Sequence, residues 1–286
     1  MLSFGPHVAE EALMRFIVVA LTAIVTLLAA SAHADVINVS LEAGKFGRLD
    51  QSETNCAAVN CGPTAAVNSF VYLQSQFPTV YTTPLVPVGK EKDVANTLNS
   101  DFMKTCPPGP DCAGGTAIED FILGKMDYIE KLDKGVTRYH AQMTETWNPI
   151  THPGAPKLDF VDDNTRPTID FLGAELKASE DIELALKPRV GDGHFVTLTG
   201  LTFDTETRMG TITFVDPKGG KVSTANITRE AGENVSIVTD YMVGDLPTRI
   251  VGASAQSPKR VPEPSTVLLL GGAAAGLIAL GWKRRR

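Results

Sequence analysis

Residues 194–200 read His-Phe-Val-Thr-Leu-Thr-Gly, and this stretch decides the fold class that the sequence predicts. Apolar and small polar side chains alternate along it, as they do in a strand with one buried face. Residues 210–215, Gly-Thr-Ile-Thr-Phe-Val, alternate in the same way, and the polar residues 205–207 between the two runs fit a hairpin loop. The sequence therefore predicts a β-hairpin here, with a last strand at residues 237–243.

The chain before this hairpin has mainly helical patterns. Apolar residues recur at helical spacing or in helix-forming runs, which predicts helices at residues 65–74, 92–102, 116–132, 168–176 and 181–186. Thr116 is the expected N-cap of the third helix. Strands are expected in this half only at residues 36–41 and 136–144. Helices first and strands second indicate an α+β domain with an N-terminal helical half and a C-terminal antiparallel sheet half.

The N-terminal segment, residues 1–34, has the features of a secretory signal peptide. Arg15 precedes an apolar run, and small residues at Ala32 and Ala34 fit a signal peptidase cut after Ala34. Met14 is the expected true start, because the residues before it do not suit a signal peptide. An N-terminal membrane anchor is the alternative, although the apolar run is short for a span.

The C-terminal segment, residues 262–286, contains an uncharged apolar run at 266–282 followed by four basic residues. A run of this length predicts a single transmembrane helix, and the basic end fixes its C-terminus in the cytoplasm. The exported domain is then expected over residues 35–251, with a polar linker at 252–261.

This tail resembles the PEP-CTERM sorting signals in three parts that occur in the right order. These are the Pro-Glu-Pro motif, the short apolar span and the terminal arginine cluster, formed by Pro262, Glu263, Pro264, Arg284, Arg285 and Arg286. The resemblance implies recognition and cleavage by an exosortase. It places the protein in the cell envelope or extracellular matrix, anchored in the cytoplasmic membrane by the C-terminal helix before processing.

Composition narrows the function classes. The net charge of −7 argues against nucleic acid as a partner, because nucleic acid requires a basic footprint. The sequence has no phosphate-cradling glycine loop and no haem-attachment cysteine pair, so no cofactor is expected.

The four cysteines lie in the exported part, where disulfides persist. Cys106 and Cys112 enclose a loop rich in proline and glycine, which a disulfide would close. Alternatively, Cys56 pairs with Cys106 or Cys112, and a bond between Cys56 and Cys61 is a third arrangement. Cys56 and Cys61, and likewise Cys106 and Cys112, are further apart in the sequence than the cysteine pairs of zinc sites usually are. No histidine is near either pair in the sequence, so no metal is expected.

Three residues form a candidate catalytic set. Cys61 directly precedes a predicted helix, whose positive end favours a thiolate. His194 opens one strand of the hairpin and Asp216 ends the other, so the hairpin would bring them to the same end. A cysteine nucleophile requires a histidine base, and a carboxylate can orient that imidazole.

The motifs Cys-Gly-Pro-Thr-Ala-Ala at 61–66, Gly-His-Phe-Val-Thr-Leu-Thr-Gly at 193–200 and Val-Asp-Pro at 215–217 resemble the papain-like cysteine peptidases of the bacteriocin-processing type. The resemblance implies a papain-like fold with Cys61 as nucleophile, His194 as general base and Asp216 as the orienting residue. That family has an oxyanion-hole glutamine six residues before the cysteine. Asn55 stands at that position here and Gln51 lies ten residues before Cys61, so both are candidates.

Two functions from different classes follow. The first is an exported papain-like cysteine peptidase or amide hydrolase, whose peptide or protein substrate the sequence does not identify. The second is a catalytically inactive papain-like protein that binds or builds the extracellular matrix, and a structural matrix protein with a coincidental motif is the remaining reading.

Overall fold

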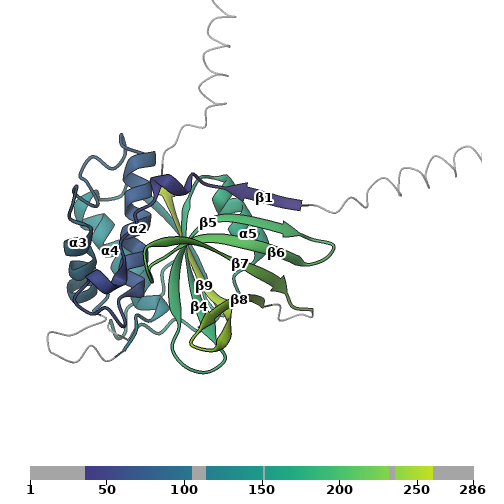
Figure 1. Ribbon diagram of the computed structural model, residues 1–286. Helices are drawn as coiled ribbons and strands as arrows, with labels where there is room; N and C mark the ends of the chain where they lie inside the picture. Colours follow the sequence, from purple (N-terminus) through teal and green to yellow (C-terminus); the bar gives the residue numbers. More distant parts are fainter. Residues whose placement is uncertain (1–35, 105–113, 151, 232–235, 260–286) are drawn as a thin grey trace, which may run out of the picture.

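Helices and strands form one body in the computed structural model, which describes residues 36–104, 114–150, 152–231 and 236–259. The helices are α2 (Cys61–Gln76), α3 (Glu91–Thr97), α4 (Ile118–Leu132) and α5 (Ile169–Lys177), with the short helical turns η1 (Ala43–Lys45), η2 (Gln51–Glu53) and η3 (Leu98–Phe102). The strands are β1 (Val36–Ser40), β2 (Thr137–Met143), β3 (Val161–Asp162), β4 (Asp181–Pro188), β5 (His194–Asp204), β6 (Met209–Asp216), β7 (Lys221–Arg229), β8 (Ile237–Val243) and β9 (Leu246–Pro258). Figure 1 shows α2, α3 and α4 gathered at one side of the strands.

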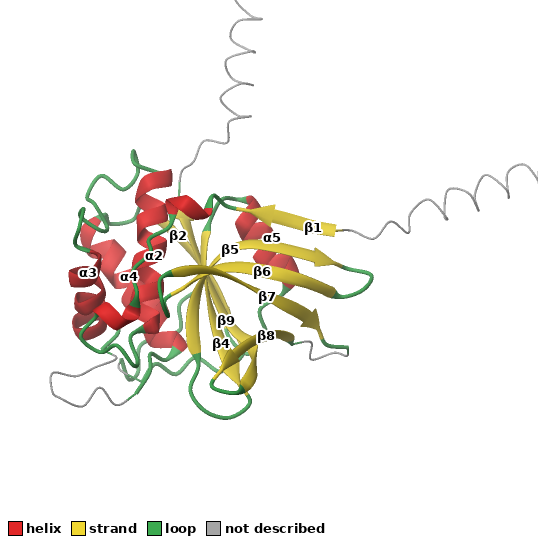
Figure 2. Cartoon of the chain, viewed as in Figure 1, coloured by secondary structure: helices red, strands yellow, loops and turns green. Residues whose placement is uncertain are grey.

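The central sheet closes on itself. Strands β5 to β9 pair as consecutive antiparallel neighbours, and β4 pairs with both β5 and β9, which completes the ring. Strand β1 extends the sheet beside β5, and β2 with β3 extends it beside β9. In Figure 2 the strands, drawn in yellow, twist and overlap in the view, and helices α2, α3 and α4, drawn in red, lie at one side of them. The result is mostly an antiparallel β-barrel to which helices are attached.

The strand that closes the barrel, β4, corrects the prediction of a helix at residues 181–186. Its sequence, Asp-Ile-Glu-Leu-Ala-Leu, contains residues that favour helices, but every second side chain is aliphatic. Ile182, Leu184 and Leu186 lie in the barrel core, while Ala185 packs in the core beneath the helices. The alternation is present in the sequence, but glutamate, leucine and alanine also favour a helix, and burial on both faces leaves no exposed polar face to mark a strand.

A further correction concerns β9, which contains residues 252–258, expected to be linker, and which follows the strand expected to be the last, 237–243. Strand β7 was not expected either. Small residues dominate residues 252–258, and Gly252, Ala253 and Ala255 resemble a spacer when only the sequence is read. In the structure the segment is buried between β4 and β2. A Cβ on Gly252 would lie 3.0 Å from Ile118 of α4, so small side chains are needed for helix and barrel to approach.

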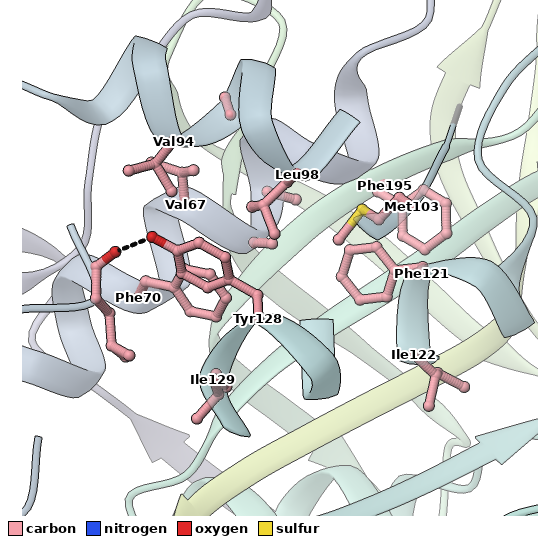
Figure 3. Packing of buried hydrophobic residues seen from close by; sticks show 14 of the residues in the cluster. Val67, Phe70, Val94, Leu98, Met103, Phe121, Ile122, Tyr128, Ile129 and Phe195 are labelled. Atoms are coloured by element: carbon pink, nitrogen blue, oxygen red, sulfur yellow. Dashed lines mark hydrogen bonds between the residues drawn. The ribbon is translucent and has the colours of Figure 1, made fainter. Parts of the chain in front are cut away.

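Two large apolar cores stabilise the two parts. One lies inside the barrel and includes one face of α5. The other joins the helices to the outer face of the barrel, and Figure 3 shows its aromatic members. Phe121 of α4 stacks on Phe195 of β5 with ring centroids 4.5 Å apart, and Phe70 stacks on Tyr128 at 5.3 Å. These contacts fix α2 and α4 against the barrel.

The predicted fold class is therefore wrong. A papain-like α+β fold has a C-terminal sheet half separate from a helical half, whereas this sheet recruits β1 and β2 from the N-terminal part and closes into a barrel. The predicted signal peptide (1–34), Pro-Glu-Pro tail and transmembrane helix (266–282) lie outside the described residues. Within the part of the chain that the structure describes, no helix has the length and apolarity to cross a membrane.

The helix ends were predicted unevenly. Strand β1 and helix α5 occur within one residue of the expected ranges, and Thr168 caps α5 by accepting a hydrogen bond from the backbone of Phe171. Helix α2 starts four residues earlier than expected, so Cys61 is its first residue and does not precede it. Helix α4 starts two residues later than predicted, with Ala117 rather than Thr116 at its N-cap position. The side chain of Thr116 instead lies against Gly62, as described below.

Candidate active site

Cys61 is the first residue of α2, the helix that packs between the barrel and the other helices. The hydroxyl of Thr197 on β5 donates to the carbonyl of Ala65 at 2.9 Å, which ties the first turns of α2 to the barrel. Cys61 is a free thiol, 8% exposed. Cys56 is disulfide-bonded, so the arrangement in which Cys56 would block Cys61 does not occur. Cys106 and Cys112 lie outside the described residues. A bonded Cys56 and a free Cys61 agree with the alternative in which Cys56 pairs with Cys106 or Cys112, and not with a disulfide between those two.

His194 and Asp216 meet at one end of the hairpin formed by β5 and β6. His194 is the first residue of β5, and Asp216 is the last residue of β6, which runs antiparallel to it. The Nε2 of His194 and the Oδ1 of Asp216 are 2.8 Å apart. The Cys61 side chain interacts with the same imidazole and, together with Asp216, raises its pKa. Because Nε2 is bonded to Asp216, Nδ1 is the ring atom left for the thiol.

The carboxylate of Asp216 accepts two more hydrogen bonds. The backbone N–H of Lys218 donates to Oδ1 at 2.8 Å, and the hydroxyl of Tyr241 donates to Oδ2 at 2.8 Å. The ring of Tyr241 also lies parallel to that of His194, with an interplanar angle of 8° and centroids 5.7 Å apart. Sequence reasoning missed Tyr241, because nothing in strand β8 indicates that it would reach a site formed by β5 and β6.

The contacts decide the charge states of the pair. Burial lowers the pKa of His194, but the interactions of the imidazole with Asp216 and Cys61 outweigh burial and raise the pKa to about 9. Burial raises the pKa of Asp216, but the hydrogen bond and charge of His194, with the donors Lys218 and Tyr241, bring it below its usual range. The geometry therefore favours an imidazolium held by a carboxylate at neutral pH, which is the state that stabilises a neighbouring thiolate.

A cavity of about 320 Å³ opens at these residues. Its lining includes Cys61 and His194, and two glycine-containing segments form part of its walls, residues 115–118 and 191–195. A Cβ on Gly62 would lie 2.8 Å from Oγ1 of Thr116, so a glycine after Cys61 lets the wall approach the start of α2. Ile150, which is 72% exposed, lies at the cavity, and the ion pair of Lys187 and Glu145, at 2.8 Å, also contributes to its lining.

The two oxyanion candidates are not brought into this cavity. The side-chain amide of Gln51 donates to the carbonyl of Ala57 at 2.8 Å, and its backbone N–H bonds to Pro217 at 2.9 Å. Gln51 is therefore beside the turn that follows Asp216. Asn55 is exposed, and its backbone N–H bonds to the side chain of Asn96. Neither belongs to the described residues that line the cavity.

The chemistry available at this site is nucleophilic. A thiol, an imidazole and a carboxylate in sequence can attack a carbonyl carbon and protonate the group that leaves. The described residues contain no group of three or more His, Cys, Asp or Glu side chains arranged to hold a metal ion.

The comparisons with known proteins concern the end of the chain. Residues 260–286 match the PEP-CTERM protein-sorting motif, which agrees with the resemblance carried by Pro-Glu-Pro, the apolar run and the arginine cluster. No curated protein matches the sequence. The chain thus carries a PEP-CTERM sorting motif at its C-terminus, which marks it as an exported protein and a substrate of exosortase.

Proposed function

We propose that this exported chain is a cysteine peptidase or related amide hydrolase that acts in the cell envelope or extracellular matrix. The observation that carries the proposal is the convergence of Cys61, His194 and Asp216: Cys61 and His194 line one cavity, and Asp216 is bonded to the imidazole. They come from α2, β5 and β6; His194 bonds to Asp216 at 2.8 Å, and Cys61 lines the cavity beside His194 and raises its pKa. A free, nearly buried cysteine at a helix start would not need a hydrogen-bonded histidine–carboxylate pair for stability alone.

In the proposed reaction, Sγ of Cys61 attacks the carbonyl carbon of an amide bond held in the cavity. The carbonyl oxygen becomes an oxyanion, to which backbone N–H groups at the start of α2 can donate. Imidazolium Nδ1–H of His194 gives its proton to the leaving amine. A water molecule, deprotonated by the now neutral His194, then attacks the thioester; the carboxylic acid product leaves, and the Cys61 thiolate is restored beside the imidazolium. Asp216 keeps the ring oriented in both steps.

A second candidate is a binding protein that uses the same cavity without turnover. The position of Gln51 favours it, because its amide bonds to the carbonyl of Ala57 instead of facing Cys61. Losing one oxyanion donor costs roughly a hundredfold or more in rate. The two candidates differ in whether Cys61 is reactive and whether it turns a substrate over.

The test is alkylation of the purified full chain with iodoacetamide across about pH 4 to 9, mapped by mass spectrometry. We expect Cys61 to be labelled rapidly below neutral pH and His194→Ala to lose that low-pH reactivity. His140→Ala is the matched control, because His140 also pairs with a carboxylate, that of Glu175 at 2.7 Å, but is 41% exposed in its side chain and is not part of the cavity lining.

A second measurement separates the two candidates. A peptide library incubated with the wild type and with Cys61→Ser should give fragments only with the wild type. Rapid low-pH labelling without any cleavage would favour the binding protein. Labelling only above about pH 8, as for an ordinary thiol, would exclude the thiolate–imidazolium pair and with it the peptidase.

A further inference from the structure

The histidine–carboxylate pair has a third partner that comes from a distant strand. Tyr241 on β8 donates its hydroxyl to Oδ2 of Asp216 at 2.8 Å, on the oxygen that His194 does not use. Its ring stacks on His194 and also makes an edge contact with Phe214, at 82° and 5.4 Å. Tyr241 therefore contacts both members of the pair at once.

The backbone of Tyr241 lies at an irregularity in strand pairing and is held by side-chain hydrogen bonds. The pairing of β8 with β9 shifts register between Thr239 and Met242. Thr239 Oγ1 accepts from the backbone N–H of Tyr241 at 3.0 Å, and Thr248 Oγ1 donates to its carbonyl at 3.0 Å. The two threonine hydroxyls, both buried, also bond to each other at 2.9 Å. Bulges of this kind redirect a side chain, and they occur next to active sites.

We propose that Tyr241 is a positioning residue that fixes Asp216 and His194 for Cys61. The inference rests on the proposed function for its kinetic consequences, but not for its geometry. The phenol limits Asp216 to one orientation, because both carboxylate oxygens then have donors. The Tyr241 ring is stacked on the imidazolium of His194, so the electron-rich face of the ring stabilises its positive charge. Tyr241 is not among the described residues that line the cavity, so it acts through the pair and not on a substrate.

The variant Tyr241→Phe tests this role, because it keeps the ring and removes only the hydroxyl. We expect kcat for peptide hydrolysis to fall about tenfold with little change in KM. The titratable groups that act on His194 are Cys61 and Asp216, and Tyr241 faces Asp216 from β8. Without the phenol, Asp216 protonates more readily, so the acid limit of rapid Cys61 alkylation should move up by about one pH unit.

The matched control is Tyr72→Phe. Tyr72 is also a tyrosine stacked on another ring, that of Phe46 at 4.3 Å, and its hydroxyl makes one hydrogen bond, to the carbonyl of Ser179 at 3.0 Å. Loss of this hydroxyl should leave kcat and the pH profile unchanged. If Tyr241→Phe behaves like Tyr72→Phe, the positioning role is overturned.

A measurement that does not depend on catalysis distinguishes this inference from the proposed function. In a Cys61→Ala background, NMR can follow the titration of the Asp216 carboxyl carbon and the ring nitrogens of His194. Tyr241→Phe should raise the pKa of Asp216 and broaden or shift the Nε2 proton signal. If these changes occur but the wild type cleaves nothing, the positioning role holds and the peptidase fails. If neither the NMR signals nor the kinetics change, the positioning role fails.

Discussion

Two polar clusters lie between α2 and the barrel. Each pairs a basic side chain with carboxylates, but one opens to a cavity and the other is fully buried. At the first residue of α2, Cys61 and His194 line an open cavity, and Asp216 bonds to His194. Two turns further along, Ser69 belongs to a sealed cluster in which the Nζ of Lys125 on α4 faces Asp181, at 2.8 Å, and Glu183, both on β4. Lys125, Asp181 and Glu183 are each at most 1% exposed.

The difference lies in how the charges balance. At the cavity, one imidazolium faces one carboxylate, and the carboxylate is fully hydrogen-bonded. In the sealed cluster, one ammonium faces two carboxylates, and Oδ1 of Asp181 and Oε2 of Glu183 have no partner among the described groups. Burial raises the pKa of Glu183 to about 7, so this carboxyl tends to keep its proton. The open cluster is suited to reactivity, and the sealed one holds α4 against β4.

Cys61→Ala should give the largest change in activity and almost none in stability. Removing the nucleophile is expected to lower any hydrolysis by about a thousandfold or more, and to abolish low-pH alkylation, since the remaining described cysteine is disulfide-bonded. The free energy of unfolding, measured with denaturant, should change by about 1 kcal/mol or less. Retained cleavage would show that the activity does not belong to this cavity.

Lys125→Met should show the opposite behaviour. It leaves two buried carboxylates without their cation, which costs about 3–5 kcal/mol of unfolding free energy. Lys131→Met is the control on the same helix, because Lys131 is exposed and contacts only the Phe102 ring among the partners seen here. Adding Asp181→Leu and Glu183→Leu to Lys125→Met should recover much of the loss, because apolar side chains need no cation. A change below about 1 kcal/mol for Lys125→Met would mean that the cluster does not hold the helix.

The pH dependence of stability should separate the clusters further. Glu183 has a pKa of about 7 in the folded state against an ordinary value of 4.5. Between these two pH values, Glu183 is protonated in the folded state and ionised in the unfolded state. Its contribution is therefore complete below pH 4.5 and is lost as the pH rises to about 7. Glu183→Gln should flatten the fall in unfolding free energy over that window by about 3 kcal/mol. An unchanged slope would assign the pH dependence to other groups.

His194 acts in a later window with the same sign. Its folded pKa of about 9 exceeds the ordinary value of 6.5, so its contribution is present below 6.5 and disappears as the pH rises to about 9. Chemical denaturation at several pH values can resolve the two steps, because Glu183→Gln should remove only the first.

Asn55→Ala should give the smallest effect. The side chain is exposed and the residue is fixed through its backbone N–H, so hydrolysis and stability should both stay within about twofold and about 0.5 kcal/mol of the wild type. Activity assays and denaturation check this. A loss of tenfold or more would show that Asn55 turns into the cavity when a substrate binds.

The sequence allowed the members of the open cluster to be selected, and the structure brings them together. A cysteine before a helix and a histidine and an aspartate at one end of a hairpin are local patterns with fixed geometric consequences. Tyr241 could not be selected in this way, because its approach depends on a bulge and on how β8 follows β7 around the barrel. Lys125 was hidden for a similar reason, since a lysine on a helix is usually taken as exposed.

By itself the sequence determined the sorting motif at residues 260–286, the order of most helices and strands, and the three residues of the candidate site. Only the tertiary structure decided that the sheet is a closed barrel, because β4 and β9 have neither the apolar runs nor the exposed faces that make a strand recognisable. Burial on both faces lets a strand carry helix-forming or small residues, since its neighbours and not its own composition fix its backbone. The pairing of β4 with β5 and β9 is therefore a property of the whole fold.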